Sequence, residues 1–175
     1  MASASKSDQE EIDKNLIIEP LNSTHDRSSF TCGIDALDSY LQKQANQDVK
    51  RRISRLFVAT HPDRPNTIMG YYSLSSLSID LNHLPELLAR KLPKHPIPAA
   101  LIGRLAVSKL AQGQGIGKML LVDALKRTLV VSHDIAIYAL VVDAINQEAE
   151  LFYQSFGFTH LSIESSRLFL PLRSI

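Results

Sequence analysis

The chain of 175 residues contains one cysteine, Cys32. A single cysteine can form neither an intramolecular disulfide nor a cysteine-built zinc site. No apolar run approaches the roughly 20 residues that a membrane-spanning helix needs. The polar segment Met1–Asn15 also lacks the apolar stretch of a secretory signal. We therefore expect a cytoplasmic protein with no membrane partner, no disulfide framework and no bound metal.

The length and composition favour one globular domain. Apolar residues make up 45% of the chain, which is enough for a hydrophobic core. Residues 1–14 are polar and mixed in charge, and we expect them to form a disordered tail. The single domain should then span residues 15–175.

The net charge is only +1, but the charges are segregated along the chain. Between Leu88 and His133 eight basic residues stand against one acid, Asp123. Between Lys43 and Arg55 five basic residues stand against Asp48. Such a polarised surface can attract a polyanion, although solvated helix faces explain the same pattern equally well.

The hydrophobic pattern predicts a mixed α/β chain with no internal repeat. Strands are expected at residues 16–21, 56–60, 67–79, 99–107, 136–142 and 167–172. A turn at 61–66 should join the second and third of them, and the proline-rich segment 83–98 should be loop with a short helix. Helices are expected on the apolar steps Ile34–Ala45, after the glycine-rich run 113–117, and from the cap Asn146 to Phe156.

The strongest local signal is the glycine-rich run between a strand and a helix. Uncovered backbone N–H groups and a helix N-terminus suit a pyrophosphate. A P-loop needs Ser or Thr after Gly-Lys, but Met119 follows Lys118. A dinucleotide fingerprint needs a glycine at the strand end and an acid about 20 residues later, which fits poorly. The pattern Gln-x-x-Gly-x-Gly is carried by Gln112, Gly115 and Gly117, and a plain tight turn is the remaining alternative.

Other segments turn this loop into a family resemblance. The strand Gly103–Val107, the loop and the helix Asn146–Phe158 resemble, in order and spacing, the core of GNAT acetyltransferases. The chain is most similar to the GNAT toxins of bacterial toxin–antitoxin pairs. That likeness rests on Phe30–Gly33, Leu37–Leu41, Gly70–Leu74 and Pro96–Pro98. It covers about Leu16 to Leu172 and implies the GNAT fold, a mixed central sheet flanked by helices.

The resemblance implies acetyl-CoA as acetyl donor and gives a site for it. The expected cofactor-binding residues are Leu105, Ala106, Val107, Gln112, Gly113, Gln114, Gly115, Ile116, Gly117, Lys118 and Asn146. Tyr153 occupies the position of the family's catalytic tyrosine. A phenol is protonated at neutral pH, so it can act as the acid for the departing thiolate. The alternative is that Tyr153 is a packing aromatic on an amphipathic helix.

No strong general base stands out in the sequence. Glu148 and Glu150 should be solvated helix acids, and His83, His95 and His133 fall in or beside expected loops. This absence favours an amine of low pKa, such as an α-amino group at about 7.7–8.0 rather than a lysine near 10.4. An aminoacyl-tRNA presents such an amine on an anionic scaffold, and acetylating it blocks translation in the toxin branch.

The toxin resemblance also implies partners. These are an aminoacyl-tRNA substrate, a ribbon-helix-helix antitoxin and a second copy of the chain. The residues expected to contact RNA phosphates are Arg51, Arg52, Arg90, Lys91 and Lys94. The low net charge and the acidic tail Asp8–Asp13 depart from a simple RNA-binding surface. Two other functions therefore remain open: acetylation of a protein or small-molecule amine, and binding of acyl-CoA without catalysis.

Overall fold

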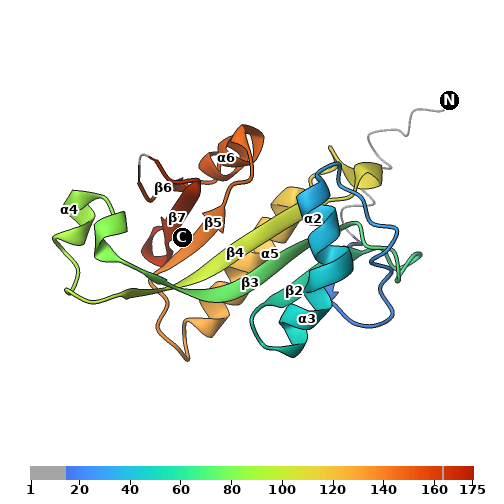
Figure 1. Ribbon diagram of the computed structural model, residues 1–175, viewed down its shortest axis with the longest axis horizontal. Coiled ribbons are helices and arrows are strands. Elements are labelled where there is room, and N and C mark those ends of the chain that lie inside the picture. Colours follow the sequence, from blue (N-terminus) through green and yellow to red (C-terminus); the bar gives the residue numbers. More distant parts are fainter. Residues whose placement is uncertain (1–14, 163) are drawn as a thin grey trace. The chain divides into compact units, whose positions relative to one another are not determined.

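The computed structural model describes residues 15–162 and 164–175. The expected tail at 1–14 lies outside them. The chain divides into two compact units. Among the described residues, unit 1 comprises residues 15–73 and Arg104–Ala124, and unit 2 comprises Leu74–Gly103 and the described residues from Leu125 to Ile175. The strands form a mixed seven-stranded sheet of order β1-β2-β3-β4-β5-β7-β6, as the α/β prediction required (Figure 1).

Unit 1 contains the first strands and the N-terminal helical segment. Strand β1 (Ile17–Pro20) pairs antiparallel with β2 (Arg55–Thr60), with Ile17 opposite Thr60. Between them, α2 (Asp35–Ser39), a π-helical segment (Tyr40–Gln44) and α3 (Ala45–Lys50) follow one another without a break. The sequence predicted the helix but not the π-helical turn inside it.

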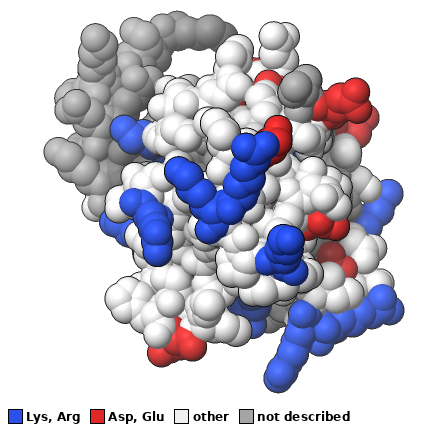
Figure 2. Space-filling model, turned by 90° about the vertical axis from the view of Figure 1, so that its left-hand side faces the viewer, with Lys and Arg blue, Asp and Glu red and all other residues white. Residues whose placement is uncertain are grey.

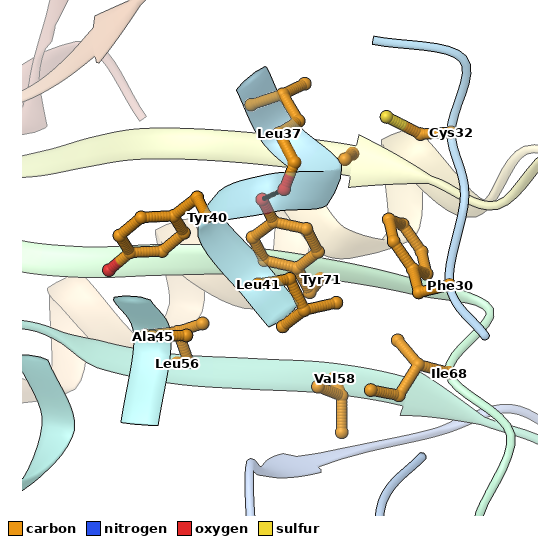
Figure 3. Packing of buried hydrophobic residues seen from close by; sticks show 11 residues of the cluster. Phe30, Cys32, Leu37, Tyr40, Leu41, Ala45, Leu56, Val58, Ile68 and Tyr71 are labelled. Carbon is orange, nitrogen blue, oxygen red and sulfur yellow. Dashed lines mark hydrogen bonds between the residues drawn. The ribbon is translucent and has the colours of Figure 1, made fainter. Parts of the chain in front are cut away.

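The core of unit 1 joins this helical segment to the strands. Tyr71, on β3 (Gly70–Ile79), is fully buried, and its hydroxyl donates to the Leu37 carbonyl at 2.7 Å. Phe30 meets the Tyr71 ring edge to face at 5.5 Å. Figure 3 shows these rings packed with Leu41, Val58 and Ile68. This packing fixes the position of Tyr40 and of the strand residues near it.

Unit 2 contains β3 from Leu74, β4 up to Gly103 and the later strands. Strand β4 (Ile97–Val107) pairs in parallel with β5 (Ala139–Asp143), and β7 (Arg167–Pro171) pairs antiparallel with β5. The short strand β6 (Thr159–His160) pairs with β7. The helices are α4 (Glu86–Ala89), α6 (Gln147–Gln154) and the end of α5 (Ile116–Val131). Short 3-10 turns lie at Leu81–His83, Lys109–Ala111 and Leu172–Ser174.

Several element boundaries differ from the sequence prediction. Strand β3 begins at Gly70 rather than residue 67, because the Thr67 N–H donates to the Arg64 carbonyl and extends the turn. Strand β5 begins at Ala139 rather than residue 136, and β6 was not predicted. The helix expected after the glycine-rich run is α5, on which Leu120, Leu121 and Ala124 are buried. Within the described ranges, no helix is both long and apolar enough to cross a bilayer.

Candidate active site

The glycine-rich loop lies in unit 1, between the end of β4 and the start of α5. After Val107 a 3-10 turn leads into Gln112, and α5 begins at Ile116. Gly113 and Gly115 adopt φ angles of +78° and +81°, which residues with a Cβ rarely do. The loop therefore turns tightly at the N-terminus of α5, where free backbone N–H groups and the positive end of the helix dipole favour an anion.

Gln112 fastens this loop to its surroundings. Its side-chain amide donates to the carbonyl of Cys32 at 2.8 Å and to that of Val107 at 3.0 Å. Both acceptors are backbone carbonyls of unit 1. The Gln112 side chain is thus used to hold the loop rather than to reach a ligand.

Two observations test whether the loop fits the phosphates and pantetheine arm of coenzyme A. A Cβ built at Gly113 meets no atom within 4 Å, so the space in front of the loop is open. The Gln114 Oε1 atom is buried without a hydrogen-bond partner among the described residues. An orphaned acceptor is costly, and a ligand N–H or O–H would relieve the cost. Open space, exposed N–H groups and one free acceptor fit a ligand that carries phosphates and amides.

The end of β4 offers an extended backbone beside this loop. Its ladder with β5 joins Ala99–Ile102 to Ala139–Val142, and β4 continues beyond it to Val107. Ala106 is buried in the core of unit 1, whereas Leu105 and Val107 are half-buried. Alternation places Leu105 and Val107 on the opposite face from Ala106. A ligand can pair with such a strand end in the manner of an added strand.

Tyr153 lies in unit 2, on α6. The Asn146 side chain caps this helix by accepting from the Ala149 N–H at 2.8 Å, and Gly157 follows its end with φ at +93°. Tyr153 is only 3% exposed, and its ring packs against Phe152 and Phe158. Its hydroxyl makes no hydrogen bond to any described residue. Burial, and then the negative charge of Asp143, raise the pKa of Tyr153 above its ordinary value.

Two ion pairs of unit 2 involve an acid on α6 or on the neighbouring β5. Asp143 binds Arg167 at 2.8 Å. Glu150 is half-buried and binds His160 at 2.6 Å, so the expectation that it is a solvated acid was wrong. The error arose because β6, which carries His160, was not predicted. Glu148 is exposed as expected, and so are His83, His95 and His133.

The expected RNA-contacting residues are distributed over both units. Arg51 and Arg52 are exposed just after α3 in unit 1. Arg90, Lys91 and Lys94 are exposed after the end of α4 in unit 2, but Arg90 pairs with Glu86. Figure 2 shows Lys and Arg side chains standing out from a largely neutral surface, with fewer Asp and Glu. Lys91 and Lys94 make no ion pair with a described residue.

The described part of the chain gives little support to a nucleophilic cysteine or to a metal site. Burial, followed by the nearby Asp38 carboxylate, raises the pKa of the Cys32 thiol to about 11. A thiol that remains protonated is a poor nucleophile. No group of three metal-ligating side chains occurs in residues 15–162 and 164–175.

Comparison with known families defines the class of protein. Residues 52–160 match the family described as "Acetyltransferase (GNAT) domain". The chain therefore belongs to the GNAT acetyltransferase family, as its loop and helix patterns indicated.

Individual relatives narrow the class further. The chain is 34% identical to the "Probable toxin TacT" of Sinorhizobium fredii, over 91% of this chain and 92% of that protein. It is 36% identical to a "tRNA-acetylating toxin" of Mycobacterium tuberculosis, over 79% of this chain and 81% of that protein. These relatives are toxins, which confirms the branch that the sequence resembled.

Solved structures agree in fold. The chain is similar to AtaT complexed with acetyl-methionyl-tRNAfMet, with TM-score 0.83, 30% identity and coverage of 91% and 96% of the two chains. It is also similar to a tyrosine-to-phenylalanine mutant of the AtaT toxin, bound to acetyl-CoA and to the C-terminus of the antitoxin AtaR. In that case the TM-score is 0.78 at 29% identity, with coverage of 91% and 95%.

Proposed function

We propose that this chain transfers an acetyl group from acetyl-CoA to the α-amino group of an aminoacyl-tRNA and thereby acts as a translation-blocking toxin. The observation that carries the chemical part is Tyr153, a buried tyrosine on a capped helix, whose hydroxyl has no hydrogen-bond partner among the described residues. The similarity to tRNA-acetylating relatives supports the substrate. Residues 52–160, which match the family, run through both units, so residues 15–175 act as one acetyltransferase domain.

The glycine-rich loop and the end of β4 bind the donor. Backbone N–H groups of residues 112–118 hold the pyrophosphate at the start of α5. Leu105 and Val107 pair through their backbone with the pantetheine arm, and an N–H near this strand end supports the oxyanion. Asn146 is the least direct of the expected contacts, because its side-chain oxygen already caps α6.

The reaction needs one proton at the sulfur. The amine nitrogen attacks the thioester carbon, the carbon–sulfur bond breaks, and the electron pair leaves with the thiolate. Tyr153 donates its hydroxyl proton to that sulfur, and the proton lost by the acetylated nitrogen returns to the phenolate through water. The raised pKa of Tyr153 keeps the hydroxyl protonated before each turnover.

An acceptor of low pKa suits the side chains present. Glu150 and Asp143 are both engaged in ion pairs, so neither is a free base. An α-amino group, with a pKa of about 7.7–8.0, is partly unprotonated at neutral pH and needs no strong base. Exposed Lys91 and Lys94 provide cations for RNA phosphates.

The toxin function brings further proposals about partners. A ribbon-helix-helix antitoxin binds the chain, a second copy forms a homodimer with it, and both act in the cytoplasm. The antitoxin complex of AtaT supports the first of these in its general form.

Acetylation of charged tRNA tests the substrate. Purified protein is incubated with labelled acetyl-CoA and, separately, with aminoacylated tRNA, the same tRNA deacylated, and a lysine-rich peptide. We expect label only in the charged tRNA, released as N-acetyl amino acid on mild alkaline hydrolysis of the ester. Label in the peptide but not in charged tRNA would instead identify a protein or small-amine acetyltransferase.

A further inference from the structure

Arg104 on β4 has no ion-pair partner among the described residues. The residue is half-buried, and its guanidinium carbon lies 3.5 Å above the centroid of the Tyr40 ring. Its backbone N–H donates to Ser73 Oγ at 3.0 Å, but its side chain makes no hydrogen bond or ion pair with a described residue. Charged groups that leave water normally acquire a partner of opposite charge. This guanidinium has no such partner among the described residues, so it is suited to bind an anionic ligand.

The Tyr40 ring beneath Arg104 is held in place by its own hydrogen bond and its position in the helical segment. Tyr40 is the first residue of the π-helical segment, and such segments are frequent at functional sites. Its hydroxyl donates to Asp48 Oδ2 at 2.8 Å, and the Gln44 amide donates to Asp48 Oδ1 at 3.0 Å. Figure 3 shows the Tyr40 hydroxyl directed away from the other labelled side chains. Asp48 is thus committed to the far end of the ring and does not pair with Arg104.

Stacking on an aromatic face leaves the donors of a guanidinium available. The face of Tyr40 attracts the cation through the ring, while the planar fork of N–H groups remains in the plane above it. A stacked arginine is therefore pre-organised to bind a phosphate through two parallel hydrogen bonds. An exposed lysine such as Lys91 has no comparable support.

The position of Arg104 in the chain links it to the donor strand. It directly precedes Leu105, which the proposed function assigns to the pantetheine arm. Its side chain leaves β4 on the same face as that of Ala106, the face that packs on the helical segment. Arg104 therefore belongs to the donor strand, but its side chain lies on the other face from those of Leu105 and Val107.

We propose that Arg104 is a positioning residue that binds a phosphate of the acceptor RNA close to its aminoacylated 3′ end. This proposal rests on the proposed function. In an aminoacyl-tRNA the carboxyl group of the amino acid is esterified, so the nearest anion to the reacting amine is a phosphodiester. The phosphates of acetyl-CoA are the other source of the same chemistry, but they belong to the loop at residues 112–118.

The test compares acceptors with and without phosphate. Wild type, Arg104→Gln, Arg104→Lys and the control Arg64→Gln are assayed on an aminoacyl-tRNA and on the same amino acid esterified to adenosine. Arg64 is an exposed arginine of unit 1 in the turn after β2, so the control makes the same charge change. For Arg104→Gln we expect kcat/KM on the tRNA to fall about ten- to a hundredfold. Turnover of the aminoacyl-adenosine and the KM for acetyl-CoA should be unchanged, and Arg104→Lys should fall in between.

Each other result overturns the proposal. An equal loss on both acceptors, or no loss on either, would show that Arg104 only supports Tyr40 and the fold. A raised KM for acetyl-CoA would assign the guanidinium to the donor. Thermal melting checks folding, and Arg104→Lys serves if Arg104→Gln does not fold.

A failure of the proposed function has a separate signature. If wild type acetylates neither acceptor, that function is wrong, and binding of deacylated tRNA then decides on Arg104. Weaker binding by Arg104→Gln, with a salt slope reduced by about one, supports the phosphate contact. Unchanged binding overturns it.

Discussion

Tyr153 combines burial, a raised pKa and an unused hydroxyl. A buried tyrosine that only packs normally satisfies its hydroxyl, as Tyr71 does on the Leu37 carbonyl. A hydroxyl kept free is instead suited to a transient partner. Tyr153→Phe should therefore lower kcat by roughly two to four orders of magnitude, the usual range for a lost general acid. Acetyl transfer to charged tRNA measures the change.

The same variant leaves other properties intact if this role is correct. Acetyl-CoA affinity and melting temperature should barely change, since Phe keeps the ring contacts with Phe152 and Phe158. Tyr138→Phe, a half-buried tyrosine elsewhere in unit 2, is the matched control and should remain fully active. Full activity in Tyr153→Phe would return Tyr153 to the role of a packing aromatic.

Secondary-structure elements with strong local signals were predicted well, and those set by distant contacts were not. Asn146 and Gly157 indicated the two ends of α6. In the structure Asn146 makes the N-terminal cap bond, and Gly157 has a positive φ just after the helix. The loop at 113–117 and the buried face of α5 were equally local. Tyr40, at the start of the π-helical turn, shares a core cluster with Tyr71 of β3 and Ala106 of β4, and no nearby residue signals the turn. The hydrogen bond that Asp123 of α5 accepts from Tyr72 of β3 at 2.6 Å also joins elements far apart in the chain.

The candidate site shows the same division. The strand and the loop were predicted from motifs that are continuous in sequence, and the resemblance to the GNAT family then proposed Tyr153. Arg104 was part of a quoted motif, but its role depends on Tyr40, which lies far away in the chain. The pairing of Glu150 with His160 also joins two elements, and one of them is only two residues long. Contacts of this kind have no sequence period to reveal them.

The glycine-rich loop makes a prediction at the scale of one element. Gly115→Glu introduces a side chain and a negative charge where the pyrophosphate is proposed to bind, so acetyl-CoA affinity should fall at least about tenfold. Gly157→Glu is the control, because it makes the same change at a similar φ of +93°, compared with +81° at Gly115. Both should lose stability through backbone strain, but only the loop variant should lose affinity in calorimetry. Equal affinities would mean that the donor binds elsewhere.

For the molecule as a whole, the segregated charges predict a salt-dependent interaction with RNA. Lys91→Glu combined with Lys94→Glu should weaken tRNA binding and reduce the slope of log affinity against log salt by about two. Arg90 is omitted because it already pairs with Glu86. The control, Arg64→Glu with Lys126→Glu, makes the same change in net charge at two other exposed positions. Equal losses of affinity in the two double variants would show that net charge, rather than the position of Lys91 and Lys94, attracts the RNA.

The buried thiol and phenol groups of the molecule predict that the folded protein loses stability at alkaline pH. Burial raises the pKa of Cys32 to about 11 and that of Tyr40 to about 12, and it raises the pKa values of Tyr71 and Tyr153 as well. Below their unfolded pKa values, near 8.5 for the thiol and about 10 for the phenols, these groups do not make stability pH-dependent. Above them, the unfolded chain loses protons that the folded chain retains, so the free energy of unfolding must fall as pH rises. Each group contributes up to about 1.4 kcal/mol per pH unit, Cys32 from about pH 9 and the tyrosines from about pH 10.

Urea denaturation at a series of pH values measures this fall in the free energy of unfolding, and tyrosinate absorbance should appear together with unfolding. Tyr40→Phe should be less stable at neutral pH, because it loses the bond to Asp48, yet show a shallower decline between about pH 10 and pH 12. Tyrosinate absorbance from all the tyrosines of the folded protein at about pH 10 would contradict the raised pKa values, including the one that keeps Tyr153 protonated.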